Sequence, residues 1–309
     1  MADPLAQRLA DATVDRRRLK RRLVWWRSIA IVVVIAALAA GGWFFLRGET
    51  LPPGGSYIAR VPITGIIEDD PKLVEHLGRL AENSRVSGVM VTVNSPGGTF
   101  SGSEALYYAL RDLSNAKPTA AVVGGMAASG GYMAAIATDH IVARSGSITG
   151  SVGVIFQMPN VHRLLDDLGI RVETVRSGPL KARPSPLEPV SGAALDATER
   201  LINDLFNQFV GFVTERRTLS ESALEQVTRG GVFTGRRGQE LGLVDALGGE
   251  REARQWMATA RGIDPETPVV DRPMTDETFW WQELLENIES RARVGATPIL
   301  DGPWAIWHQ

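Results

Sequence analysis

The sequence predicts an α/β domain with a largely parallel sheet, followed by a helical C-terminal part and preceded by one transmembrane helix. Short apolar runs alternate with amphipathic segments between residues 57 and 176, which is the pattern of strands and helices in such a domain. Helical spacing of apolar residues dominates after residue 190. Nineteen residues without a charge, 28–46, are long enough to cross a bilayer as a helix.

Charge is distributed unevenly along the 309 residues. Residues 1–27 carry eight Lys/Arg against three Asp, a net of +5, which leaves −7 for the rest of a chain whose total is −2. A nucleic-acid-binding domain would be basic, so the acidic remainder argues against that class. By the positive-inside rule, the basic run Arg16–Arg22 predicts a cytoplasmic N-terminus.

The apolar run after the basic segment has two interpretations. Trp25, Trp26 and Trp43 lie near its two ends, where indole rings favour membrane interfaces, and this indicates an uncleaved anchor. A cleaved signal peptide, with Ala37-Leu38-Ala39 as the cleavage site, is the alternative, but the apolar run continues to Leu46. We therefore expect a basic cytoplasmic tail, an anchor and a linker, at residues 1–23, 24–46 and 47–56. The rest of the chain is then expected outside the cytoplasm.

Individual elements follow from local patterns. The predicted strands are 57–67, 87–94, 119–125 and 172–176, with further extended segments in 140–154. The predicted helices are 71–84, 104–116, a short one after Ser129, 161–169, 197–217, 220–228, 235–242 and 250–260. Ser101 and Glu104 have the spacing of a capping box before the second of these helices. These elements define one domain over 57–262, and a tryptophan-rich extension over 263–309 remains without a predicted structure.

Residue usage excludes several kinds of site. There is no cysteine, so disulfides, thiolate metal sites and cysteine nucleophiles are excluded. The four histidines are scattered without metal-binding spacing, so we expect no metal.

Glycine-rich turns follow three of the predicted strands: NSPGG, GGMAASGG and GSITGSVG. The carboxyl ends of parallel strands gather at one edge of a sheet, where sites form. Ser129 lies in the second turn, at the start of a helix whose partial positive charge would stabilise an alkoxide. Backbone N–H groups next to such glycines can form an oxyanion hole. Alternatively, the glycines only allow turns and Ser129 caps a helix. Phosphate binding is disfavoured because neither a P-loop nor a GxGxxG motif is present.

A nucleophilic serine requires a base, and no histidine is well placed for that role. Only four of the 33 basic residues are lysines: Lys20, Lys72, Lys117 and Lys181. Arginine cannot be deprotonated in proteins, whereas a buried lysine can lose its proton. Lys181, in the loop SGPLKARPSP, is the best placed of the four, although an ordinary solvated lysine is the alternative interpretation.

In order and spacing, the motifs NSPGG, MAASGGYMAA, GSITGSVGV, SGPLKARPSP and GGVFTGRRGQELGLVDALGG resemble those of SppA-type signal peptide peptidases. These are serine-lysine proteases of the Clp/crotonase fold, which stacks ββα units. The resemblance spans about residues 57–260 and implies Ser129 as nucleophile, Lys181 as general base and Ser151 as a support for the lysine. It also implies oxyanion N–H groups from Gly98 and Gly130, with Gly97 and Tyr132 contacting the substrate.

The same resemblance implies an enzyme without metal or cofactor that hydrolyses hydrophobic peptides such as released signal peptides. It implies a homo-oligomeric ring or dome at the bacterial inner membrane, with the catalytic domain on the periplasmic side. The wide apolar arc of the helix 197–217 is consistent with an interface between subunits. Two alternatives remain: a catalytically silent scaffold or peptide-binding protein of the same fold, and an acyl-CoA enzyme, which the expected location disfavours.

Overall fold

The computed structural model describes residues 25–38 and 55–271. The chain divides into two units, residues 1–55 and 56–309. In the first unit, residues 25–38 are helical. No helix within the described ranges is both long and apolar enough to span a membrane. The predicted tail 1–23 lies outside the described residues, as do parts of the predicted anchor 24–46, linker 47–56 and extension 263–309.

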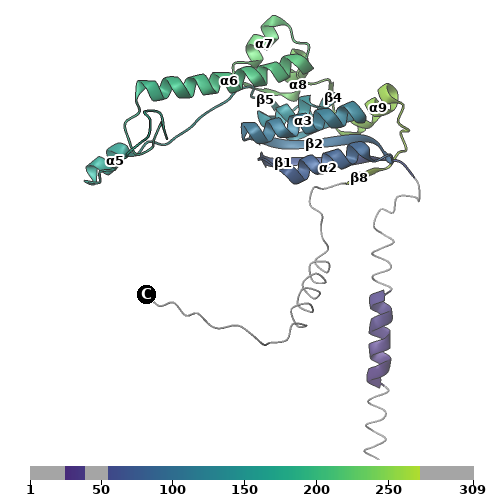
Figure 1. Ribbon diagram of the computed structural model, residues 1–309. Coiled ribbons are helices and arrows are strands. Elements are labelled where there is room, and N and C mark those ends of the chain that lie inside the picture. Colours follow the sequence, from purple (N-terminus) through teal and green to yellow (C-terminus); the bar gives the residue numbers. More distant parts are fainter. Residues whose placement is uncertain (1–24, 39–54, 272–309) are drawn as a thin grey trace, which may run out of the picture. The chain divides into compact units, whose positions relative to one another are not determined.

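A mixed, mainly parallel sheet forms the centre of the second unit (Figure 1). The strands run in the order β6-β5-β3-β2-β1-β8, with β4 paired to β3 and β7. Every pairing is parallel except that of β5 with β6. The strands are β1 (Tyr57–Ile67), β2 (Val86–Gly98), β3 (Thr119–Ala128), β4 (His140–Ala143), β5 (Ile148–Gly150), β6 (Val232–Thr234), β7 (Ala246–Leu247) and β8 (Val269–Asp271). The predicted α/β class with a parallel sheet is confirmed.

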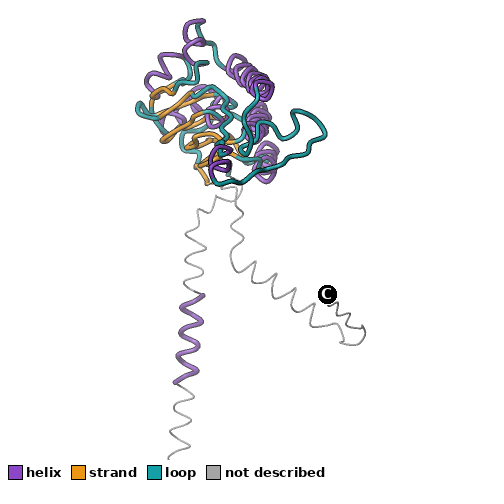
Figure 2. The backbone as a smooth tube through the Cα atoms, turned by 90° about the vertical axis from the view of Figure 1, so that its left-hand side faces the viewer, coloured by secondary structure: helices purple, strands orange, loops and turns teal. Residues whose placement is uncertain are grey.

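Helices connect and cover these strands, and in Figure 2 several of them are stacked along one side of the strand layer while others lie elsewhere around it. They are α2 (Pro71–Glu82), α3 (Phe100–Ala116), α4 (Gly130–Ile136), α5 (His162–Asp167), α6 (Gly192–Arg216), α7 (Glu221–Val227), α8 (Gly235–Leu241) and α9 (Glu250–Arg261). On one face of the sheet, Met90, Ala120 and Val142 form a buried cluster with Ala253 and Met257 of α9. Because side chains alternate along a strand, their neighbours in sequence point to the opposite face, and both faces are buried.

Several local predictions were wrong. Residues 95–98, predicted as a turn, belong to strand β2, and α6 begins at Gly192, five residues before its predicted start, because Ser191 caps it. Helix α3 begins four residues earlier than predicted, because the Thr99 side chain accepts a hydrogen bond from the Gly102 N–H and caps it, so Ser101 lies inside the helix. Residues 172–176 form no strand, and they lie in a segment between β5 and α6 whose only described helix is α5. Val175 in this segment is fully exposed. The alternating apolar residues of the segment therefore do not pack as a strand in a sheet.

Helix α4 is held at both ends by side chains from later in the chain. Tyr132 is fully buried, and its hydroxyl donates a 3.0 Å hydrogen bond to the carbonyl oxygen of Leu243. At the other end, the Arg216 guanidinium of α6 donates to the carbonyl oxygens of Ile136 and Thr138, each at 3.0 Å. Burial raises the pKa of the Tyr132 phenol, so it remains a donor at any physiological pH.

Tyr132→Phe should lower the free energy of unfolding by about 1–2 kcal/mol, because the buried Leu243 carbonyl loses its donor. Thermal denaturation followed by circular dichroism measures this. Tyr108→Phe is the control, since Tyr108 is 53% exposed and water can replace its hydrogen bonds. Equal melting temperatures for the two variants would contradict the stabilising role of this hydrogen bond.

Candidate active site

The site is built where three neighbouring strands end. Strand β2 ends at Gly98, β3 ends just before Ser129, and β5 ends just before Ser151. Pairing of β3 with both β2 and β5 brings these ends together, with Ala127 opposite Ser95 and Ala128 opposite Gly150. The carboxyl ends of parallel strands thus meet, as expected from the positions of the glycine-rich turns.

Ser129 has an unusual backbone conformation for a residue with a side chain, with φ 51° and ψ −121°. Its N–H donates to the Gly150 carbonyl oxygen at 2.9 Å, and its own carbonyl accepts from Met133 N–H, so this conformation is anchored on both sides. Although Ser129 occupies the N-cap position of α4, its side chain makes no capping hydrogen bond. The alternative interpretation of Ser129 as an ordinary helix cap is therefore wrong, and its hydroxyl is left for other chemistry.

Glycines let the end of β2 approach Ser129 very closely. A Cβ on Gly97 would lie 2.8 Å from the Gly130 nitrogen and 2.9 Å from the Ser129 Cβ. A Cβ on Gly98 would lie 1.8 Å from the carbonyl oxygen of Ile67 at the end of β1. These distances are shorter than side chains tolerate, so the geometry requires glycine at both positions. Gly130 is the first residue of α4, where N–H groups have no partner within the helix.

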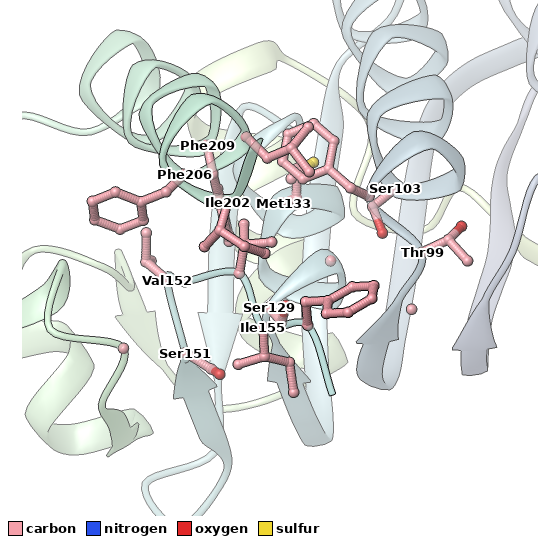
Figure 3. Close-up of a pocket in the computed structure, with 18 of the residues that line it drawn as sticks. Thr99, Ser103, Ser129, Met133, Ser151, Val152, Ile155, Ile202, Phe206 and Phe209 are labelled. Atoms are coloured by element: carbon pink, nitrogen blue, oxygen red, sulfur yellow. The ribbon is translucent and has the colours of Figure 1, made fainter. Parts of the chain in front are cut away.

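A cavity of about 830 Å³ opens beside Ser129 (Figure 3). The residues that line it include Ser129, Ser151, Gly98, Gly130 and Thr99. Apolar side chains from α3, α4, the segment after β5, and α6 form part of its walls: Phe100, Met133, Val152, Ile155, Phe156, Leu201, Ile202, Leu205, Phe206 and Phe209. Polar residues line it as well, namely Ser103, Asn203, Thr228 and Arg229. The apolar arc of α6, which the sequence alone suggested as an interface between subunits, thus forms much of one cavity wall.

The structure brings together four of the predicted site residues: Ser129, Ser151, Gly98 and Gly130. Gly97 and Tyr132 are not among the residues that line the cavity. The Gly97 N–H donates a hydrogen bond to the Ser95 hydroxyl at 3.0 Å. Gly97 packs against Ser129 and Gly130, so it supports these two residues without lining the cavity itself. Tyr132 is buried in the core, and its role is structural. Neither residue is positioned to contact a substrate.

Lys181 does not line the cavity in the single chain. It is exposed, within the segment that projects beyond α6 together with α5 in Figure 1. Neither His140 nor His162 offers a substitute base. His140 stacks on Trp256 away from the cavity, and burial lowers its pKa. His162 is exposed at the start of α5.

The loop that carries Lys181 is organised by ion pairs. Glu188 binds Arg176 at 2.5 Å and Arg183 at 2.6 Å, and all three side chains are at most 21% exposed. Its hydrogen bond with Arg176 is the main cause of a lowered Glu188 pKa. Asn160 donates to the carbonyl oxygens of Ser185 and Glu188. The loop is therefore folded on itself although it lies apart from the sheet.

Sequence reasoning missed the apolar residues that shape the cavity and also missed Ser103, which lies in the first turn of α3 and lines it. For α6 a signal existed, because its apolar arc is wider than one core-facing stripe. For Ser103 there was none beyond its closeness to the NSPGG turn, since a serine in the first turn of a helix is common.

Comparison with known proteins adds an independent finding. The sequence model described as "Peptidase family S49" matches residues 111–264, which include Ser129, Ser151 and Lys181. The Synechocystis sp. protein named "Putative protease slr0021" is 39% identical over 218 residues, covering 69% of this chain and 78% of that protein. Protease 4 of Haemophilus influenzae is 30% identical over 206 residues, covering 63% of this chain and 33% of that protein.

A third relative is the Enterococcus faecium protein named "Putative signal peptide peptidase SppA", which is 29% identical over 237 residues. That match covers 72% of this chain and 69% of the relative. The similarity extends over the strand ends that carry Ser129 and Ser151, and it agrees with a serine exposed to a cavity beside two glycine turns. The chain belongs to peptidase family S49 and is a serine peptidase of the SppA type.

Proposed function

We propose that the chain is a membrane-anchored serine endopeptidase that hydrolyses hydrophobic peptide segments, such as released signal peptides, with Ser129 as nucleophile and Lys181 as general base. Residues 57–262 would constitute the peptidase domain, with the Clp/crotonase-type arrangement of its units. The observation that carries the proposal is that the Ser129 side chain makes no capping hydrogen bond and lines a large cavity together with Gly98 and Gly130.

Backbone strain supports these assignments. Among the described residues other than glycine, only Ser129 (φ 51°), Ser151 (φ 55°) and Ala182 (φ 56°) have positive φ. The first two are the proposed nucleophile and its supporting serine, and the third follows Lys181 directly. Such conformations cost energy, and they persist where the surrounding structure imposes them, commonly at functional sites.

Cavity chemistry supports the substrate class. A peptide carbonyl next to Ser129 would lie near the backbone of Gly98 and Gly130, whose N–H groups would stabilise its oxygen when it becomes negative. The side chains of Phe206, Phe209 and Met133 would then contact the peptide's own side chains. Apolar walls favour apolar side chains, and one relative is named a signal peptide peptidase.

Transfer of the Ser129 proton requires Lys181 to reach the cavity. We propose that a second copy of the chain supplies it, within the predicted homo-oligomer. The segment between β5 and α6 exposes many apolar side chains, among them Ile155 (81%), Leu168 (64%) and Val175 (101%). A monomeric surface seldom exposes so many apolar side chains close together, and contact with a neighbouring copy would bury them.

The membrane anchor and the periplasmic location of the catalytic domain are proposed from the sequence alone. The support is the uncharged run 28–46 after a basic segment. An anchor at this position would hold the cavity close to a bilayer, where released signal peptides remain.

The position of Lys181 outside the cavity also favours a second candidate function, a catalytically silent scaffold that binds apolar peptides. A fluorophosphonate probe distinguishes the two, because it reacts covalently with an activated serine. We expect labelling of wild type at Ser129. A silent scaffold would remain unlabelled.

Lys181→Arg should reduce hydrolysis of an apolar fluorogenic peptide as completely as Ser129→Ala, by about 1,000-fold or more, because a guanidinium cannot accept the serine proton. The double variant should be no slower than either single variant, since the two residues act as one unit. Lys72→Arg on α2 is the control and should retain full activity. Substantial activity in Lys181→Arg would exclude Lys181 as the base.

Mixing two inactive variants, Ser129→Ala and Lys181→Ala, should restore part of the activity. Co-assembled subunits would contain sites in which an intact Ser129 from one copy faces an intact Lys181 from another. Activity is measured before and after subunit exchange, together with light scattering to establish the oligomer. If exchange is demonstrated and no activity returns, the two residues act within one chain.

Protease treatment of intact spheroplasts should cleave the chain after residue 50 and spare the first 22 residues, as the proposed orientation requires. Immunoblotting against tags at each end measures this. Cleavage that occurs only after the cytoplasmic side is exposed would reverse the proposed topology.

A further inference from the structure

Ser103 is a buried polar residue at the active-site cavity that the mechanism above does not use. It lies in the first turn of α3, is 1% exposed, and is among the residues that line the cavity (Figure 3). Its hydroxyl oxygen is buried and has no hydrogen-bond partner in the described part of the chain. A buried hydroxyl without a partner is destabilising, so internal hydrogen bonding does not explain a serine at this position.

The Ser103 hydroxyl oxygen lies directly against Gly130. A Cβ on Gly130 would be 2.0 Å from this oxygen but 2.9 Å from the Ser103 Cβ, so the oxygen is the atom in closest contact. The same hypothetical Cβ would lie 3.4 Å from the Gly97 Cα. The hydroxyl of Ser103 therefore occupies the side of Gly130 on which a Cβ would lie, next to the backbone of Gly97.

We propose that Ser103 is a positioning residue of the peptidase: its hydroxyl, packed on Gly130, fixes the backbone that presents the Gly130 N–H to the substrate. The proposal rests on the proposed function of Ser129 and Gly130. When Ser129 Oγ attacks the scissile carbonyl carbon, the Oγ proton passes to the base and the carbonyl π electrons move to oxygen. The Gly130 N–H donates a hydrogen bond to that oxygen. When the C–N bond breaks, the leaving amine takes the proton from the base.

The hydroxyl acts through Gly130 and does not itself contact the substrate, since its oxygen is closed to solvent. The Ser103 hydroxyl is expected to lower the energy of the transition state and not that of the bound substrate. The oxygen of the scissile carbonyl becomes negative only in the transition state. Loss of this packing atom would let the Gly130 peptide shift, and small displacements of an oxyanion donor reduce the rate strongly.

Ser103→Ala removes the packing atom and tests the proposal. We expect kcat for an apolar fluorogenic peptide to fall about 10- to 100-fold, with KM changed less than about twofold. A peptide aldehyde, whose hemiacetal oxygen occupies the oxyanion position, should bind more weakly by a similar factor. The melting temperature should stay equal or rise, because the variant also removes a buried hydroxyl without a partner.

Ser103→Cys and Ser101→Ala complete the experiment. The cysteine variant places a sulfur against Gly130 and should recover most of kcat, whereas Ser101 is exposed in the same turn of α3 and its alanine variant should match wild type. Wild-type kcat in Ser103→Ala would overturn the proposal, as would a loss of kcat accompanied by a lower melting temperature. If wild type is itself inactive and Ser129 unlabelled by a fluorophosphonate, the proposed function has failed instead.

Discussion

The structure of the site depends on one close approach, between the end of β2 and the start of α4. A Cβ on Gly97 would lie 2.8 Å from the Gly130 nitrogen and 2.9 Å from the Ser129 Cβ, so the approach requires glycine at position 97. Next to this contact, Ser129 has φ 51° and ψ −121°, and its side chain makes no hydrogen bond to the helix it precedes. A serine in an ordinary N-cap conformation would bond to its own helix, and its hydroxyl would not be available as a nucleophile. Neighbouring residues support this contact. The Ser95 hydroxyl accepts a hydrogen bond from the Gly97 N–H, and the Gly150 carbonyl accepts one from the Ser129 N–H. The Ser103 hydroxyl packs against Gly130.

Long-range interactions hold the two partners of that contact in place. The sheet supplies the first set, because pairing of β3 with β2 and β5 aligns three strand ends. The second set comes from residues far along the chain: Leu243 accepts the Tyr132 hydroxyl hydrogen bond, and Arg216 binds the last carbonyls of α4. Helix α6 therefore has two roles, since the arginine near its C-terminus supports α4 while Phe206 and Phe209 form a wall of the cavity.

The two halves of the proposed dyad differ in how they are held. Ser129 is fixed by a buried sheet and a short helix, whereas Lys181 lies on an exposed loop organised by Glu188 and two arginines. A loop that is exposed and folded on itself suits a lysine that reaches Ser129 of another copy when the subunits assemble. On the proposal that a second copy supplies Lys181, activity requires assembly and an unassembled subunit is inert.

Local sequence predicted most of the strands and the glycine-rich segments at their ends, because buried strands need continuous apolar runs and close approaches of the backbone need glycine. It also made Ser129 the candidate nucleophile. It also determined Lys181 as the candidate base, since only four lysines are present. Tertiary structure decided what local patterns do not encode. Residues 172–176 alternate like a strand but find no partner, and Thr99 caps α3 where Ser101 was predicted to. Tyr132 and Gly97 belong to the right motifs, yet both lie behind the site, and Ser103 lies against it without a sequence signal. The reason is physical: which side of a turn faces a cavity depends on contacts between segments far apart in the chain, and a motif specifies only its own backbone.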